Sequence, residues 1–146
     1  MKGGWQLTVN RPVTEVFDFL ADIRNETAWN PRVKQIEKES GGPITMGTIF
    51  RGHYKALGTL VTEVTAYERP TRLSFQSTGE RMHLRGTFTL TPVGSGTSVA
   101  LSAELQPGGL FAVVAPLMTP LITRQNAVAA RRLKAALDEP RSTMPR

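Results

Sequence analysis

The chain has 146 residues, a length that suits one domain with a sizeable hydrophobic core, and it contains no cysteine. Disulfides, thiol catalysis and cysteine-based metal sites are therefore excluded. The formal net charge is +6, but the arginines are scattered along the chain, so we expect no nucleic-acid-binding patch. Only Arg131, Arg132 and Lys134 cluster, and a solvated helix face explains them more simply than a membrane-surface contact.

The sequence carries no signal for membrane insertion or export. The opening residues MKGGWQLTVN lack the apolar core of a signal peptide. The longest apolar run, Leu110 to Ile122, contains two prolines and is too short to span a bilayer. We therefore expect a cytoplasmic protein that is not stably inserted into a membrane.

The first predicted elements are a strand and two short helices. Apolar and polar residues alternate from Trp5 to Val9, as in a strand with one buried face. Apolar residues spaced by three and four follow Pro12, which indicates an amphipathic helix with proline at its start. Asp22 or Asn25 is expected to cap a second short turn that ends near Trp29, just before a proline.

Six further strands are predicted, separated by turns rich in glycine and proline. They are Val33–Glu39, Thr48–Ala56, Gly58–Glu68, Leu73–Thr78, Met82–Thr91 and Thr97–Leu105. In the strand that begins at Gly58, alternation places Leu60, Thr62, Val64 and Ala66 on one face. The turns recur about every 10 residues, a spacing typical of an antiparallel meander.

From Pro107 onward the pattern changes to that of one long helix. Apolar residues keep three- and four-residue steps down to Leu137, and Pro116 and Pro120 are expected to kink the first half. The segment Glu139 to Arg146 has little apolar content and is expected to be a flexible tail. Residues 1–138 are thus predicted to form a single α+β domain.

This order of elements resembles the START-like superfamily, also called SRPBCC or helix-grip proteins, and within it the polyketide cyclase/dehydrase and lipid-transport group. The resemblance rests on VNRPVTEVFDFLADIRNETAWNPRV, Gly47-Thr48, TEVTAYERPTRLSFQ and LMTPLITRQNAVAARRLKAALDE. It implies a curved antiparallel sheet of about seven strands wrapped around a long C-terminal helix. It also implies a cavity between them, which in similar proteins takes lipids, sterols, hormones or polyketide intermediates.

The residues themselves favour a cavity as well. A single sheet cannot bury its concave face on itself, and only one long helix is available to cover it. Small side chains such as Thr62, Ala66 and Ser77 lie on the predicted inner face, although collapse of the kinked helix is the alternative. The predicted ligand-binding residues are Trp29, Phe50, Tyr54, Leu60, Val64, Phe75, Leu84, Phe88, Phe111, Met118 and Ile122. For Trp29, a place at the cavity rim and a cap on the core remain open.

No cofactor motif or metal-ligand spacing occurs, and His53 and His83 are isolated histidines on strands. General acid–base catalysis by Arg51, His53 and Tyr54 would require these side chains to face inward. Because residues alternate along a strand, two arrangements are open. In one, Arg51 and His53 face the interior; in the other, Phe50 and Tyr54 do, and Arg51 and His53 lie in solvent.

Two functions follow as hypotheses. The first is a binding or carrier protein for a hydrophobic small molecule such as a lipid or polyketide, with no cofactor. The alternative is a polyketide cyclase or dehydratase that uses general acid–base catalysis in the same cavity.

Overall fold

A computed structural model describes residues 2–109, 112–113 and 115–138 of the chain. The prediction for Phe111 and the prediction of a tail over residues 139–146 therefore lie outside the described residues. Met118 and Ile122 lie in described helices, but their side chains are outside the described part.

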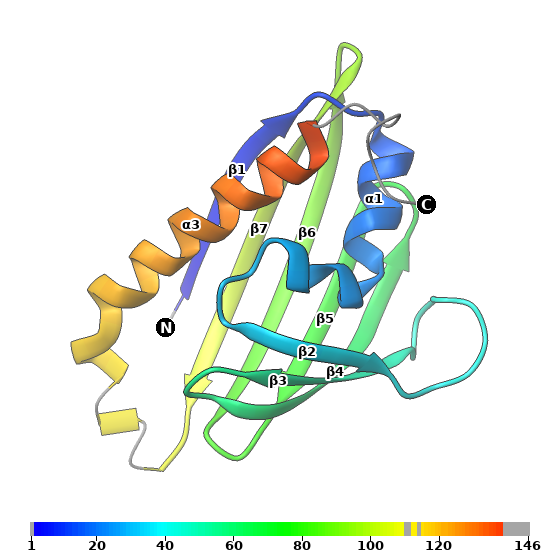
Figure 1. Ribbon diagram of the computed structural model, residues 1–146. Coiled ribbons are helices and arrows are strands. Elements are labelled where there is room, and N and C mark those ends of the chain that lie inside the picture. Colours follow the sequence, from blue (N-terminus) through cyan, green and yellow to red (C-terminus); the bar gives the residue numbers. More distant parts are fainter. Residues whose placement is uncertain (1, 110–111, 114, 139–146) are drawn as a thin grey trace.

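Seven antiparallel strands form one open, curved sheet, as the sequence predicts (Figure 1). The strands are β1 (Lys2–Val9), β2 (Val33–Lys38), β3 (Ile49–Tyr54), β4 (Gly58–Glu68), β5 (Arg72–Thr78), β6 (Met82–Val93) and β7 (Gly96–Pro107). Their order across the sheet is β1-β7-β6-β5-β4-β3-β2, so the last strand pairs with the first. Each remaining strand pairs with its neighbour in sequence, which is the predicted meander.

The described helices all lie on one side of this sheet (Figure 1). They are α1 (Val13–Ala21), the 3-10 helix η1 (Ile23–Ala28), the 3-10 helix η2 (Ala115–Met118) and α3 (Thr119–Asp138). The segment with α1 and η1 connects β1 at one edge of the sheet to β2 at the other, so it crosses the concave face. The architecture is the α+β helix-grip fold that the sequence predicts.

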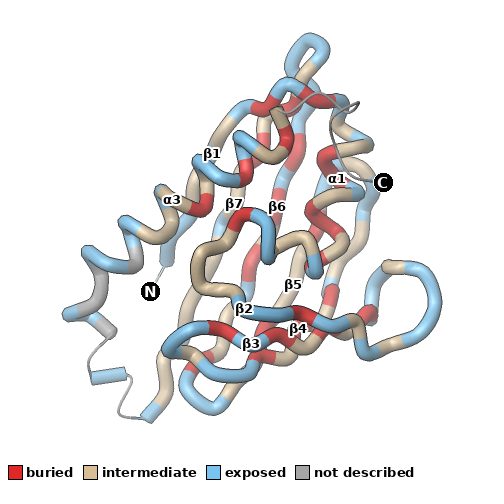
Figure 2. The backbone as a smooth tube through the Cα atoms, in the orientation of Figure 1, coloured by how far each residue is buried: buried red, intermediate tan, exposed pale blue. Residues whose placement is uncertain are grey.

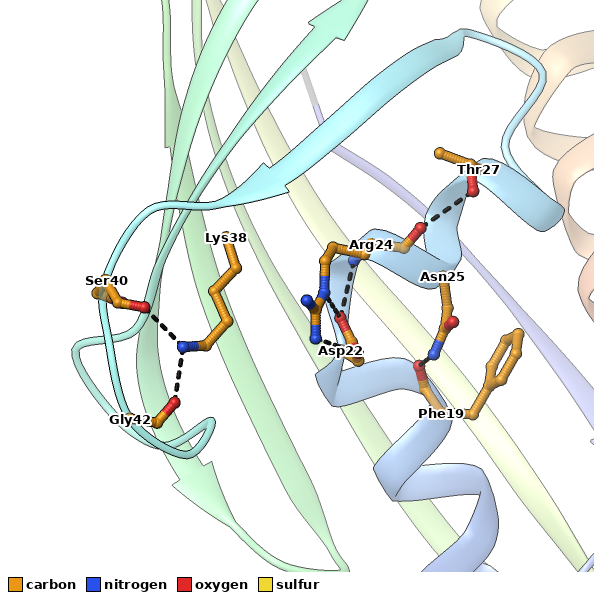
Figure 3. A network of polar contacts seen from close by, with 8 residues as sticks. All are labelled: Phe19, Asp22, Arg24, Asn25, Thr27, Lys38, Ser40 and Gly42. Carbon is orange, nitrogen blue, oxygen red and sulfur yellow. Dashed lines mark hydrogen bonds and ion pairs between the residues drawn. The ribbon is translucent and has the colours of Figure 1, made fainter. Parts of the chain in front are cut away.

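Local side-chain contacts end α1 and begin η1 (Figure 3). The Asp22 carboxylate accepts a hydrogen bond from the Arg24 backbone N–H at 3.2 Å, so Asp22 is the cap of η1. Asn25, the alternative cap, instead donates its amide to the Phe19 carbonyl oxygen in the last turn of α1, at 2.9 Å. These contacts fix the angle between the two short helices, and hence the side chains that η1 directs toward the sheet.

A β-bulge in β4 changes which side chains face the helices. The pairing of β4 with β5 shifts register between Val64 and Ala66, and an extra residue reverses the alternation beyond that point. Tyr67 consequently packs against Phe17 of α1, with ring centroids 5.2 Å apart. The expectation that Ala66 continues the inner face is therefore wrong, because period-two alternation does not survive a bulge.

The C-terminal helix is confirmed, with its prolines at the start. Pro116 lies in η2 and Pro120 in the first turn of α3, where a missing backbone N–H breaks no intrahelical hydrogen bond. The α-helix α3 thus begins at Thr119 and not near Pro107, and the predicted kink inside its first half is wrong because the two prolines lie before it or in its first turn. No described helix is both long enough and apolar enough to span a membrane.

Among the described residues of α3, the buried ones all lie in its second half (Figure 2). Ala129, Leu133 and Leu137 are buried at four-residue spacing, whereas Leu121 is 48% exposed. The buried half is also held by polar contacts, because Arg11 donates its Nε–H to the Leu137 carbonyl oxygen at 2.8 Å. The described residues in the first half of α3 therefore add no buried side chain to the core.

Candidate functional site

A cavity of about 330 Å³ lies between the concave face of the sheet and the helices. Its size falls at the lower end of the range for small-molecule sites, roughly 300–1,000 Å³. The apolar side chains that line it are Trp5, Leu20, Ile23, Trp29, Ala56, Leu57, Leu60, Phe75, Met82, Leu84, Phe88, Leu101, Ala103, Leu105, Leu121 and Ala129. Every strand except β2 contributes to the lining, so the cavity follows the curvature of the sheet.

Four aromatic side chains form one wall of the cavity. Trp29 packs edge-on against Trp5 and Phe88, with ring centroids 6.5 Å apart in both pairs. Phe75 adds to this group at 5.8 Å from Phe88. Trp29 is only 8% exposed, so it both closes the core and lines the cavity, and the two interpretations of this residue are compatible.

Two glycines make room for aromatic rings at the cavity wall. A Cβ atom on Gly86 would lie 2.5 Å from the Phe75 ring, so only glycine lets that ring lie across β6. A Cβ atom on Gly52 would lie 2.6 Å from the Tyr54 ring. Gly52 therefore permits the position from which the Tyr54 hydroxyl reaches η1.

The helix η1 and its C-terminal cap present three residues to the cavity at a spacing of three. Ile23, Glu26 and Trp29 all line it, because side chains three residues apart are aligned in a 3-10 helix. This alignment brings one carboxyl group into an otherwise apolar row. The sequence contains that signal, but it becomes visible only when the turn is read with 3-10 spacing.

The Glu26 carboxyl group is held by two donors. Tyr54 donates its hydroxyl to Glu26 Oε2 at 3.1 Å, and Asn30 donates its amide to Glu26 Oε1 at 2.7 Å. Burial raises the pKa of Glu26 above its ordinary value, although both hydrogen bonds and the Arg32 charge act in the opposite direction. Burial also raises the pKa of Tyr54, so this phenol stays protonated and remains a donor.

Arg32 reaches across from the residue before β2 to α3. Its Nη2 donates to Asn126 Oδ1 at 2.6 Å, a contact between residues 94 positions apart in the chain. Burial lowers the pKa of Arg32, and the nearby Glu26 partly offsets this effect. Its Nε–H is buried and has no hydrogen-bond partner. Both Arg32 and Asn126 line the cavity.

The exposed lining residues mark the opening of the cavity. They come from the start of β1, from the turn between β3 and β4, and from the first half of α3. Lys2, Lys55 and Leu121 are examples, and each is exposed to solvent. The solvent-exposed side of the cavity is therefore bordered by the first half of α3.

The structure divides the predicted site residues into three groups. Trp29, Tyr54, Leu60, Phe75, Leu84 and Phe88 line the cavity. Phe50 and Val64 have no exposed surface and belong to the packed core. Phe111 and the side chains of Met118 and Ile122 lie outside the described part of the chain.

Two of the three candidate catalytic residues point away from the cavity. In β3 the buried residues are Phe50, Gly52 and Tyr54, so Arg51 and His53 face the opposite side. Arg51 forms an ion pair with Glu39, and His53 contacts the Thr59 hydroxyl at 3.1 Å. Tyr54 alone of the three reaches the interior.

Sequence reasoning missed the polar part of the site. No local sequence pattern joins its residues, because they come from distant elements. Glu26 lies in η1, Asn30 and Arg32 lie between η1 and β2, and Asn126 lies in α3. In the described residues no group of three or more acidic, histidine or cysteine side chains comes together in a way that would hold a metal ion. Against apolar walls the cavity offers a carboxyl group, a phenol, a guanidinium, three amides and three hydroxyl groups, with two lysines at its opening.

A curved antiparallel sheet that holds a cavity against a C-terminal helix places the protein in the helix-grip class of folds. The chain belongs to the family described as polyketide cyclase / dehydrase and lipid transport, whose profile matches residues 6–138. No curated protein sequence matches this chain.

Solved structures show the same fold at low sequence identity. A START superfamily protein from Mycobacterium smegmatis is 13% identical, with a TM-score of 0.71 over 93% of this chain and 96% of its own. A protein from Thermus thermophilus is 17% identical, with a TM-score of 0.73 over 94% and 97%. A hypothetical protein from Helicobacter pylori is 11% identical, with a TM-score of 0.77 over 94% and 88%.

Proposed function

We propose that this protein binds a hydrophobic small molecule in its internal cavity and acts as a binding or carrier protein. The observation that carries this proposal is the cavity of about 330 Å³ with predominantly apolar walls. An apolar ligand releases ordered water and gains about 0.8 kcal/mol for each methylene group that it buries. Membership in a family that includes lipid-transport proteins supports the same conclusion.

The intrinsic fluorescence of the protein provides a direct test. The chain has two tryptophans, Trp5 and Trp29, and both line the cavity. We expect a series of 1-alkanols of increasing length to change this fluorescence saturably. The affinity should rise about fourfold for each added methylene, since 0.8 kcal/mol corresponds to that factor.

The gain should stop at the length at which the alkyl chain fills the cavity. A length limit distinguishes an enclosed site from adsorption to exposed apolar surface, for which affinity continues to rise with chain length. Absence of any saturable change, together with a native mass spectrum of untreated protein that shows no bound molecule, would argue against the proposal.

A second candidate function, a polyketide cyclase or dehydratase, is favoured by one specific feature. Glu26 combines a raised pKa with a hydrogen bond from Tyr54, and both side chains line the cavity. The Glu26 carboxylate can remove a proton next to a carbonyl group. Once Glu26 holds that proton, the Tyr54 hydroxyl can turn from Glu26 to donate to the enolate oxygen that forms. Arg51 and His53 do not support this candidate, because they face away from the cavity.

Kinetics on Tyr54→Phe and Glu26→Gln variants test this candidate. If the protein is an enzyme, each variant should lower turnover of an aldol or dehydration substrate by about 10²-fold or more while it still binds. Equal turnover in the variants and the wild-type protein would exclude these two residues as the catalytic pair.

A further inference from the structure

The charged residues around the cavity are predominantly basic. Lys2, Arg32 and Lys55 are cationic, and Glu26 is the one acidic residue among the described lining residues. Lys2 and Lys55 are exposed, which places them at the opening. The apolar body of the cavity therefore opens past a cationic rim.

Arg32, a half-buried residue of the cavity lining, has unused hydrogen-bonding capacity. Its Nη2 is occupied by Asn126, but its buried Nε–H donates to no atom. No ion pair in the described residues includes Arg32. A buried donor without an acceptor is unfavourable, and native structures keep few of them without a reason.

Glu26 does not supply the missing acceptor. Its two oxygens already accept hydrogen bonds from Tyr54 and Asn30. Burial also favours its neutral form, which weakens the negative charge available to Arg32. The guanidinium therefore remains an incompletely paired cation beside an apolar cavity.

We infer that the ligand is an amphiphile with a carboxylate head, which accepts a hydrogen bond from Arg32 while its apolar body occupies the aromatic wall of the cavity. This inference rests on the proposed binding function and specifies the class of ligand. A planar, singly charged carboxylate matches one edge of a guanidinium group, and the lysines at the rim add favourable charge.

The test compares two probes of equal length, decanoate and 1-decanol, by titration of tryptophan fluorescence at pH 8. The measured quantity is the ratio of the decanol Kd to the decanoate Kd. We expect the wild-type protein to prefer decanoate by roughly 10- to 100-fold, the range for a hydrogen bond to a charged group. Arg32→Gln should remove most of this preference and leave only the small, solvent-screened contribution of the exposed lysines. Arg24→Gln is the control: it alters an exposed arginine of η1 that pairs with Asp22, and it should retain the wild-type ratio.

Each outcome bears on a different statement. If decanol binds and decanoate has no advantage, or if the Arg32→Gln ratio equals the wild-type ratio, the carboxylate inference is wrong and the binding function stands. If neither probe binds, the proposed function fails as well.

A second measurement needs no variant. The ¹³C carboxyl resonance of bound, labelled decanoate should titrate at a lower pH than that of the free ligand, because Arg32 stabilises the charged form. A carboxyl pKa raised on binding would mean that the head lies in the apolar interior, and would overturn the assignment.

Discussion

Glu26 shows how one residue can carry opposing interactions. Its carboxyl group lies in a row with Ile23 and Trp29, and it accepts hydrogen bonds from Tyr54 and Asn30. Burial outweighs these interactions and raises its pKa. The folded protein consequently binds this proton more tightly than the unfolded chain does, so ionisation of Glu26 opposes folding.

Replacement of Glu26 by glutamine should therefore change the dependence of stability on pH. The favourable contribution of neutral Glu26 is fully present below its unfolded pKa and is lost as the pH rises through its raised folded pKa. We expect Glu26→Gln and wild-type protein to have similar free energies of unfolding near pH 4. The variant should become relatively more stable toward pH 8. Urea unfolding across this range measures the difference, and a difference independent of pH would contradict the raised pKa.

At the scale of elements, the two halves of α3 are held differently. The C-terminal half is anchored to the start of the chain, because Arg11 donates to the Leu137 carbonyl and Asp138 accepts from the Asn10 backbone N–H at 2.8 Å. Lys134 adds a bond to the Thr8 carbonyl at 3.1 Å. The N-terminal half, with exposed Leu121, borders the opening of the cavity. One end of the helix thus supports the fold while the other flanks the site.

We predict that Arg11→Met destabilises the protein by about 2 kcal/mol, the typical contribution of a hydrogen bond to a charged group. Arg11 is 7% exposed, so water cannot replace the lost donor at the Leu137 carbonyl. The free energy of unfolding in urea measures the effect. Arg69→Met is the matched control, because the exposed pair of Arg69 with Asp18 is screened by solvent and should contribute much less. Equal losses in the two variants would show that Arg11 does not anchor α3.

At the scale of the whole molecule, the cavity is a cost to the fold. At about 24 cal/mol per Å³, the value for engineered cavities, an empty volume of about 330 Å³ corresponds to an upper bound on the order of 8 kcal/mol. The total stability of a domain is about 5–15 kcal/mol. The stabilisation that a ligand provides by filling the cavity can therefore be a substantial fraction of the free energy of unfolding.

A side chain that occupies the cavity should remove the stabilisation that a ligand provides. A ligand at 100 times its Kd adds about 2.7 kcal/mol to the stability of the wild-type protein, which raises Tm by about 5–11 °C. Ala103→Phe places a ring in the cavity from β7, so 1-decanol should raise the Tm of this variant much less than that of the wild-type protein. Ala100→Phe introduces the same ring on the outer face of β7, next to Gln6 and Thr89, and should retain the wild-type rise. An undiminished rise in Ala103→Phe, measured by thermal denaturation, would place the ligand elsewhere.

The sequence by itself determined the order of elements, the antiparallel meander and the membership of the family. The order of elements and the meander depend on local periodicity: alternation in β1, three- and four-residue steps in α1, and glycine or proline at the turns. The family follows from the resemblance of longer sequence segments, and the family profile matches residues 6–138. The same periodicity placed Leu60, Phe75, Leu84 and Phe88 on the face that lines the cavity, because it specifies the face on which a side chain lies. It left the orientation of Tyr54 open, and Trp29 was predicted from its place in a turn.

Only the tertiary structure decided which part of that face is covered and which part remains a cavity. Phe50 and Leu60 both face inward, yet Phe50 is sealed in the core and Leu60 lines the cavity. The bulge in β4 reversed the alternation of side chains beyond it, and hydrophobic periodicity in the sequence does not predict where a bulge occurs. The contact of Arg32 with Asn126 joins residues 94 positions apart, so it forms only after η1 and α3 have docked on the sheet. Local spacing records the direction of a side chain, whereas a binding site depends on what long-range packing places opposite it.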